Sequence, residues 1–210
     1  MSRDWEPAEA VAALARADRD LGRAMRRLGP FAMPLPRRQD PFAYLLRAIV
    51  YQQLSGHAAA AIHGRVVRLF PGGRPSAARL ADLDDEALRA AGLSAAKRAA
   101  LRDLAEKRIG GIVPSRARLA RMPDEEILER LTAVRGVGAW TVQMLLIFSL
   151  GRPDVLPDTD LGVRKGFARS FGIGDLPAPA EIRRRGERWR PWRSVASWYL
   201  WRAADGAGTP

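Results

Sequence analysis

The chain contains no cysteine, only two histidines, and only three lysines (Lys97, Lys107 and Lys165) among its 35 basic residues. The lack of cysteine excludes disulfides, thiolate nucleophiles, zinc ribbons and iron–sulfur clusters. Two histidines leave little for a histidine-based metal site. Any catalysis by this protein is therefore expected to depend on carboxylates.

The sequence also lacks any run of 18 apolar residues and any sustained alternation of apolar and polar residues. The first absence excludes a transmembrane helix, and the charged Arg3, Asp4 and Glu6 stand where a signal peptide needs an apolar segment. Apolar residues instead recur every three or four positions, which predicts an all-α protein. We expect it to be soluble and intracellular.

Acidic residues are outnumbered: 35 Lys and Arg against 23 Asp and Glu give a net charge of +12 and a pI of about 11.3. This balance points to a polyanionic partner, with nucleic acid as the leading candidate. Nearly all of the positive charge is arginine, which suits phosphate binding. Arginine also accumulates in proteins of GC-rich genomes, and we attribute most of the excess to that cause.

Prolines, glycines and capping residues divide the chain into helices. We expect a first helix over 7–27, a linker from Pro30 to Pro36, a helix capped by Asp40 that begins at Pro41 and ends near Gln53, and a helix capped by Ser55 that ends near Phe70. Further helices are expected over 77–81, 84–91, 94–108, 116–121, 124–131, 139–150, 161–171 and 190–203, with a frayed tail over 205–210.

Val134-Arg-Gly-Val-Gly138 must turn sharply between two of these helices. Its glycines allow left-handed backbone angles and close approach to a surface. Backbone N–H groups at the start of the helix from Ala139 would offer an anion site to a phosphate, independent of nucleotide sequence. A tight helix–helix corner without a ligand is an equally good interpretation of Gly-x-Gly alone.

The residues around this turn resemble a known family. Leu131-Thr-Ala-Val-Arg-Gly-Val-Gly-Ala-Trp-Thr-Val-Gln143 is followed by a hydrophobic helix and then by Pro153-Asp-Val-Leu-Pro-Asp-Thr-Asp-Leu-Gly-Val-Arg-Lys165. Tyr51-Gln-Gln-Leu-Ser-Gly56, Gly92-Leu-Ser-Ala-Ala-Lys97 and the tryptophan-rich 187–201 add to the pattern. Over about 40–203 the chain resembles the helix-hairpin-helix DNA glycosylase superfamily, in its 3-methyladenine DNA glycosylase II (AlkA-like) branch.

The resemblance implies one glycosylase domain over 1–210, built of two helical lobes, with the hairpin motif at about 124–150. Only about 40 residues precede Pro41, so we expect a short form without the extra N-terminal domain of longer relatives. The implied activity is that of a monofunctional glycosylase. It would flip alkylated purines of the 3-methyladenine and 7-methylguanine type out of double-stranded DNA and hydrolyse their N-glycosidic bond, which starts base excision repair. We expect a monomer that is cytoplasmic, nucleoid-associated when acting, and without a membrane partner.

The resemblance makes Asp160 the catalytic carboxylate. Cleavage of an N-glycosidic bond builds an oxocarbenium-like sugar, which an ionised carboxylate can stabilise while it aligns or activates water. Asp160 also suits the N-cap of the helix that follows, and the two roles are compatible. Asp158 is the alternative catalytic carboxylate.

Two tryptophans fall where such enzymes place aromatic surfaces around the flipped base, namely Trp140 and Trp201. An indole face attracts a cationic purine by about 0.5–2 kcal/mol. Met144 stands where some relatives have an aromatic residue, so the substrate pocket is expected to be wider. For Trp189, Trp192 and Trp198 we favour a place in the core.

Bifunctional relatives carry a lysine two residues after the last hairpin glycine, where it forms a Schiff base with the sugar. Here that position is Trp140, and no lysine lies between Lys107 and Lys165. Lyase activity is therefore not expected.

Further DNA contacts follow from the resemblance. Gly136, Val137, Gly138 and Ala139 would grip a phosphate, and a side chain after the first core helix would fill the gap left by the flipped nucleotide. Gln53 is the first choice for this wedge and Leu54 the alternative, although a glutamine pair can also simply cap a helix end.

No cofactor is expected for catalysis. Relatives bind a structural monovalent cation at the hairpin through main-chain carbonyls, which here would be those of Thr132, Val134 and Val137. Such a Na⁺ or K⁺ ion would bridge the hairpin to a DNA phosphate.

Two rival functions use the same charge and hairpin. One is a non-catalytic DNA-binding module, and the other is a helical RNA-binding protein. Neither gives a purpose to Asp160 and the region of Trp201, so we favour the glycosylase.

Overall fold

The computed structural model describes residues 5–34 and 39–206, and within these ranges it contains helices, turns and loops but no strand. The chain divides into two compact units. We call Met1–Arg37 with Leu146–Pro210 the terminal unit, and Arg38–Leu145 the central unit. The expectation of an all-α, two-lobed fold is confirmed.

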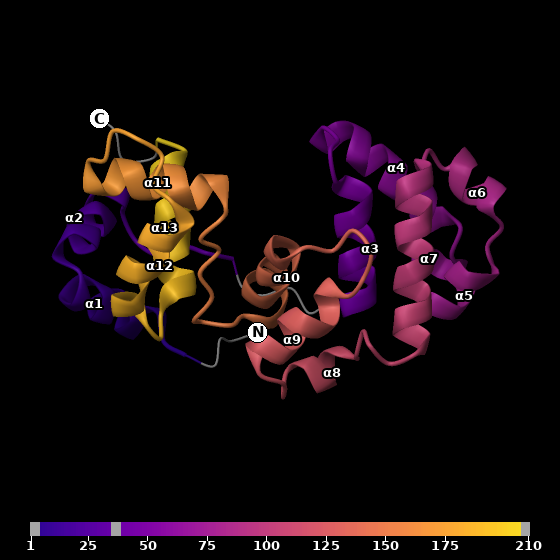
Figure 1. The fold of residues 1–210 in the computed structure, drawn as a ribbon, viewed down its shortest axis with the longest axis horizontal. Coiled ribbons are helices and arrows are strands. Elements are labelled where there is room, and N and C mark those ends of the chain that lie inside the picture. Colours follow the sequence, from indigo (N-terminus) through magenta and orange to yellow (C-terminus); the bar gives the residue numbers. More distant parts are fainter. Residues whose placement is uncertain (1–4, 35–38, 207–210) are drawn as a thin grey trace. The chain divides into compact units, whose positions relative to one another are not determined.

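The central unit is built around α3 (Pro41–Tyr51), which packs against α4, α7 and α10 (Figure 1). The other elements are α4 (Gly56–Arg68), η1 (Pro71–Gly73), α5 (Ala77–Asp82), α6 (Asp85–Ala90), α7 (Ala95–Ile109), α8 (Arg116–Leu119), α9 (Asp124–Thr132) and α10 (Ala139–Leu145). The Asp40 side chain accepts a hydrogen bond from Phe42 N at 2.9 Å, so α3 begins where the capping pattern predicts.

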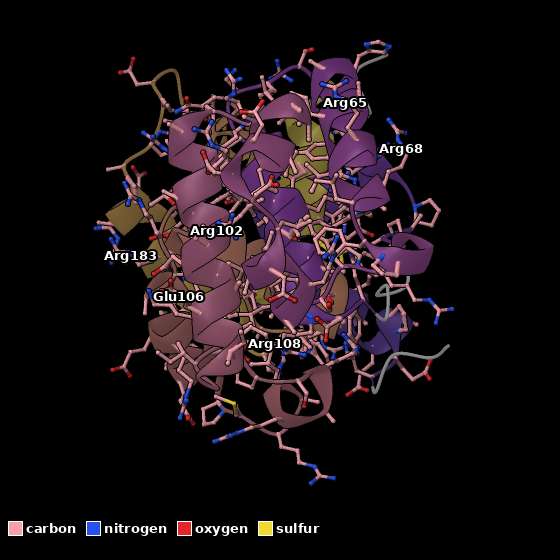
Figure 2. All side chains as sticks on the ribbon, turned by 90° about the vertical axis from the view of Figure 1, so that its right-hand side faces the viewer. Arg65, Arg68, Arg102, Glu106, Arg108 and Arg183 are labelled. Carbon is pink, nitrogen blue, oxygen red and sulfur yellow. The ribbon has the colours of Figure 1, made fainter. Side chains whose placement is uncertain are left out.

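Arginines on α7 bind carbonyl oxygens of neighbouring segments of the central unit; Arg102 and Arg108 are labelled in Figure 2. The Arg102 guanidinium donates to the Leu80 carbonyl oxygen at 2.8 Å, in α5. Arg108 donates to the Val113 carbonyl oxygen at 3.1 Å and forms an ion pair with Asp40 at 2.9 Å. One guanidinium can serve several acceptors at once, which a lysine ammonium does less well. Part of the arginine excess is therefore structural, which composition alone did not predict.

In the terminal unit, α11 (Leu161–Phe171) and α13 (Arg193–Ala204) form the main helix pair, and α2 (Arg19–Leu28) lies against both (Figure 1). The unit also holds α1 (Pro7–Ala17), the π-helical η2 (Leu146–Leu150), α12 (Pro179–Gly186) and η3 (Glu187–Trp189). A Cβ on Gly166 would lie only 1.7 Å from the Leu200 carbonyl oxygen, so this glycine is what lets α11 and α13 approach so closely.

The expected single helix over 7–27 is wrong, because Asp18 breaks it. Asp18 has extended backbone angles (φ −140°, ψ 101°), and its side chain caps α2 through Leu21 N at 3.2 Å. It also forms an ion pair with Arg185 at 2.7 Å and accepts from Trp189 Nε1 at 3.1 Å. Burial alone would raise the pKa of Asp18, but these hydrogen bonds and the Arg185 charge outweigh it and lower the pKa to about 2. The interactions of Asp18 with Arg185 and Trp189 therefore end α1 at a point where the spacing of apolar residues alone predicts that the helix continues.

Three other expectations need correction. Helix α12 was missed, because its arginine-rich sequence has only Ile182 and Gly186 buried. The last helix begins at Arg193 and not at 190, after a cis Arg190–Pro191 peptide bond. The expected helix over 139–150 is α-helical only to Leu145, and its end is a π-helix.

Helix α13 ends at Ala204; the rest of the expected tail beyond Gly206, and the end of the linker after Pro34, lie outside the described residues.

The tryptophans outside the expected site are mostly core residues. Trp189 is fully buried in the hydrophobic core of the terminal unit, while Trp192 and Trp198 pack against this core and are partly buried.

In the described ranges, no helix has both the length and the apolar character needed to cross a membrane.

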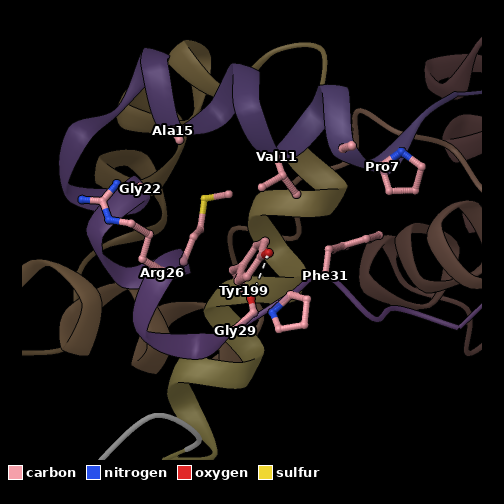
Figure 3. A pocket seen from close by; sticks show the side chains of 11 residues that line it. Pro7, Val11, Ala15, Gly22, Arg26, Gly29, Phe31 and Tyr199 are labelled. Atoms are coloured by element: carbon pink, nitrogen blue, oxygen red, sulfur yellow. Dashed lines mark hydrogen bonds between the residues drawn. The ribbon is translucent and has the colours of Figure 1, made fainter.

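A cavity of about 560 Å³ lies in the terminal unit, beside α1, α2 and Tyr199 (Figure 3). Its wall is mostly apolar, with Arg26 the charged residue that lines it. The Tyr199 hydroxyl donates to the Gly29 carbonyl oxygen at 3.3 Å within this wall. None of the site residues expected from the sequence lines the cavity.

Candidate active site and hairpin

Asp160 is the N-cap of α11, as the sequence predicts. Its Oδ1 accepts two hydrogen bonds, from Val163 N at 2.8 Å and from Trp201 Nε1 at 2.7 Å. The side chain is half-buried. The carboxylate is thus fixed in direction at the start of a helix, where the helix dipole favours a negative charge.

Trp201 reaches this carboxylate because position 162 is glycine. A Cβ on Gly162 would lie 2.8 Å from Trp201 Cδ1 and 3.1 Å from Asp160 Oδ1. Phe148 also contacts the indole, with its ring stacked on it and the centroids 5.6 Å apart. The sequence predicts Trp201 at the site, but not that its N–H holds the carboxylate.

The loop that leads to Asp160 is fastened to the first turns of α13. Arg193 Nε and Asp154 form an ion pair at 2.6 Å. Ser194 Oγ accepts from Val155 N at 3.0 Å, and Ser197 Oγ donates to the Arg193 carbonyl oxygen at 2.8 Å while also lying 3.4 Å from the Val155 carbonyl oxygen. Both serines are fully or almost fully buried. One helix therefore positions both the loop and, two turns on, the indole that contacts Asp160.

The alternative carboxylate, Asp158, has a different environment. It forms an ion pair with Arg183 at 2.6 Å, and its side chain is 13% exposed. Arg183 belongs to α12, the helix that the sequence did not predict. Asp158 therefore has an ion-pair partner in α12, which gives it a structural role.

The hairpin lies in the central unit, between the end of α9 at Thr132 and the start of α10 at Ala139. Gly136 is left-handed, with φ of +78°, and Val137 is buried with its N–H donating to the Val134 carbonyl oxygen at 3.0 Å. Gly138 is not left-handed, and a Cβ there would meet no atom within 4 Å. Both glycines would allow left-handed angles, but only Gly136 adopts them; at Gly138 the position of a Cβ is open space.

The first turns of α10 carry the other two residues expected around a base. Trp140 is 49% exposed, which is unusual for so large an apolar side chain, whereas Met144 is 8% exposed. Trp140 and Met144 belong to the central unit, and Asp160 and Trp201 to the terminal unit.

The expected wedge residues lie in the turn between α3 and α4. Gln53 is exposed and left-handed, with φ of +56°, the one non-glycine residue of the described ranges with a positive φ. Leu54 beside it is 39% exposed. The neighbouring Gln52 donates from Nε2 to the Gly136 carbonyl oxygen at 2.7 Å, so the structure brings the wedge turn and the hairpin together. The sequence interpretation gave Gln52 only the role of one of a glutamine pair at a helix end, and Gln52 is indeed the C-cap residue of α3, but its contact with the hairpin was not expected.

The main-chain carbonyls expected to hold a cation come from the same hairpin. Helix α9 ends at Thr132, and the Leu131 carbonyl oxygen of its last turn accepts from Val134 N at 3.2 Å. The Val134 carbonyl accepts one hydrogen bond, from Val137 N, and an oxygen has a second lone pair to offer. Within the described ranges, no cluster of three or more His, Asp or Glu side chains could hold a metal. Carbonyl oxygens are of the ligand type that a hard cation takes, so the residue types present are compatible with the expected Na⁺ or K⁺.

An all-helical chain of two units, with a Gly-x-Gly hairpin in one and a capped carboxylate in the other, has the architecture of a helix-hairpin-helix DNA repair protein. The model of the HhH-GPD superfamily of base excision DNA repair proteins matches residues 46–191. The chain belongs to this superfamily.

Similar proteins agree with this assignment. DNA-3-methyladenine glycosylase 1 of Schizosaccharomyces pombe is 39% identical over 168 residues, which is 80% of this chain and 74% of the relative. The structure of the S. pombe 3-methyladenine DNA glycosylase in complex with abasic DNA matches with a TM-score of 0.83 and 35% identity, over 96% of this chain and 99% of that one. A crystal structure of a DNA-3-methyladenine glycosidase from Bacillus halodurans matches with a TM-score of 0.86 and 35% identity, over 97% of this chain and 91% of that one.

Proposed function

We propose that this protein is a monofunctional DNA glycosylase that releases alkylated purines, of the 3-methyladenine and 7-methylguanine type, from double-stranded DNA. The observation that carries the proposal is the Asp160 carboxylate, held by Val163 N and Trp201 Nε1 at 2.8 and 2.7 Å, in a family whose relatives named above are 3-methyladenine glycosylases. We expect the protein to act as a monomer.

The proposed reaction requires one main catalytic group, a carboxylate. An alkylated purine of this type is cationic, so it leaves as a neutral base when the glycosidic bond breaks and both bonding electrons move to its nitrogen. The positive charge that then develops on the sugar is stabilised by the ionised Asp160. Water adds to the sugar carbon and gives up one proton, for which this carboxylate is the acceptor. The products are a free base and an abasic site in an intact strand.

The other expected residues select and hold the substrate. The exposed indole of Trp140 offers a π-face to a cationic base, which favours lesions over neutral bases. Gln53 or Leu54 fills the space left in the base stack, and Met144, in place of an aromatic residue, widens the range of bases that are accepted. The backbone from Gly136 to Ala139 binds a DNA phosphate. A structural Na⁺ or K⁺ held by the carbonyls of Thr132, Val134 and Val137 would add positive charge beside that phosphate.

The test compares two isosteric variants, Asp160→Asn and Asp158→Asn, on DNA methylated at purines. Asparagine is a good N-cap and can accept the same two hydrogen bonds, so Asp160→Asn removes the charge without removing the cap. We expect Asp160→Asn to bind duplex DNA normally and to lose base release by orders of magnitude, while Asp158→Asn retains it. Loss of activity in Asp158→Asn alone would make Asp158 the catalytic group. Absence of base release by the parent protein would favour a DNA-binding module.

The same reaction tests for a lyase step. Trp140 stands at the position of the Schiff-base lysine, so we expect no covalent adduct with DNA after borohydride reduction. A trapped protein–DNA adduct would contradict a monofunctional mechanism.

A further inference from the structure

The Gln52 side chain joins the α3–α4 turn to the hairpin. Gln52 is 84 residues away from Gly136 in sequence, yet its Nε2 donates to the Gly136 carbonyl oxygen at 2.7 Å. Gly136 is the left-handed residue of the hairpin, and Gln52 directly precedes the left-handed Gln53 of the turn. The bond therefore links the two points where the backbone changes direction.

The turn itself is held in an uncommon conformation. A left-handed glutamine is disfavoured unless the surroundings fix it. In a continued α3, the Leu54 N–H would donate to the Val50 carbonyl oxygen, but here the Lys97 ammonium takes that position at 2.7 Å. Lys97 thus ends α3 on one side of Gln53, and the Gln52 amide fixes the turn against the hairpin.

The hairpin is held from the same helix that carries Lys97. Asp103 Oδ2 accepts from Arg135 N at 2.6 Å, and Asp103 Oδ1 forms an ion pair with Lys107 at 2.5 Å. The Ala100 side chain lies 3.5 Å from where a Cβ on Gly136 would be. Lys97, Ala100 and Asp103 are spaced by three residues and so lie along one side of α7. This side of α7 supports both the turn and the hairpin.

We propose that Gln52 is a positioning residue that couples the wedge turn to the phosphate-binding hairpin. Insertion of Gln53 or Leu54 into the base stack and anchoring of a phosphate at Gly138 would then reinforce each other, because a displacement of either segment disturbs the bond to Gly136. The proposal rests on the proposed function, since it assigns DNA contacts to both segments.

The test is a double-mutant cycle for binding to a duplex that carries a tetrahydrofuran abasic site, at one fixed salt concentration. Leu54→Ala changes the turn and Gly138→Ala changes the hairpin, and each is measured alone and combined. In the parent, the combined loss of affinity should be smaller than the product of the single losses by at least about threefold. Gln52→Met keeps the length of the side chain but removes the hydrogen-bond donor. In this background the combined loss of affinity should equal the product of the two single losses.

Two further variants control for the chemistry of the change. Gln39→Met makes the same substitution outside the turn and the hairpin, and it should leave the coupling intact. Gln52→Ala removes the amide by a second route, and it should abolish the coupling as Gln52→Met does. Because Gln52 is half-exposed, thermal unfolding should change little in either Gln52 variant.

The outcomes separate the two proposals. Coupling that persists in both Gln52 variants, or that is absent from the parent, would overturn the role of Gln52 while base release from methylated DNA still supports the glycosylase. A parent protein that neither binds the abasic duplex nor releases base would overturn the proposed function and the coupling with it.

Discussion

The two hairpin glycines should respond in opposite ways to substitution by alanine. Gly136 is left-handed with φ of +78°, so alanine there should cost about 1–2 kcal/mol of stability. Its Cβ would meet Ala100 Cβ at 3.5 Å, an ordinary contact that adds no clash. For a chain of this size the loss corresponds to a fall in Tm of about 2–8 °C.

Gly138→Ala should leave the fold unharmed. Its backbone is outside the left-handed region, and the new Cβ would meet no protein atom within 4 Å. Alanine also restricts the unfolded chain, so stability should be unchanged or higher by up to about 1 kcal/mol. If the open side of Gly138 faces a DNA phosphate, the added methyl group should nonetheless weaken duplex binding by about tenfold or more, equivalent to at least about 1.4 kcal/mol.

The assay pairs thermal unfolding with titration of lesion-containing and undamaged duplexes at one stated salt concentration, since phosphate contacts are salt-dependent. The loss for Gly138→Ala should be similar on both duplexes, because phosphate contacts position a protein without reading bases. If Gly138→Ala binds both duplexes as the parent does, the phosphate-anchor reasoning fails and the hairpin is only a helix–helix corner.

Three further predictions concern the terminal unit. Because the pKa of Asp18 is about 2 in the folded protein, against an ordinary value of 3.8, its contribution is complete above about pH 4 and is lost as the pH falls towards 2. This contribution of the Asp18 carboxylate to the free energy of unfolding amounts to roughly 2 kcal/mol. The free energy of unfolding of Asp18→Asn should therefore be lower than that of the parent above pH 4, and it should vary less between pH 5 and 2. An unchanged dependence on pH would contradict the network with Arg185. Gly166→Ala should destabilise the protein by about 3 kcal/mol or more, seen as a lower Tm, because its Cβ would lie 1.7 Å from the Leu200 carbonyl oxygen and helices must separate to accommodate it. Trp201→Phe keeps an aromatic ring but removes the N–H that holds the Asp160 carboxylate. Single-turnover base release should therefore slow by about tenfold or more while affinity for undamaged duplex stays the same; equal rates would show that the bond has no role in catalysis.

Local chemistry explains which parts of the fold could be predicted from the sequence. The starts of α3, α4, α7 and α11 follow from Asp40, Ser55, Ser94 and Asp160, each of which caps its helix through its own side chain. These signals act over three residues, and so they can be recognised in one sequence.

The expectations from the sequence failed where residues far away in the chain determine the local structure. The break at Asp18 depends on Arg185 and Trp189, which lie 167 and 171 residues further along the chain. Similarly, the contact of Trp201 with Asp160 spans 41 residues and requires a glycine at 162, which no spacing rule indicates. The resemblance to a family placed these residues at one site, but only the structure shows which atoms meet.

The arrangement along α13 also determines which changes in chain length this protein can accept in evolution. Ser194, Ser197 and Trp201 act from one side of the helix, and each added residue turns a helix by about 100°. A single insertion between Ser197 and Trp201 would direct the indole away from Asp160, although every individual residue of the site were preserved. Insertions and deletions should instead be found in the irregular stretch over 172–178, where α11 has ended and α12 has not begun.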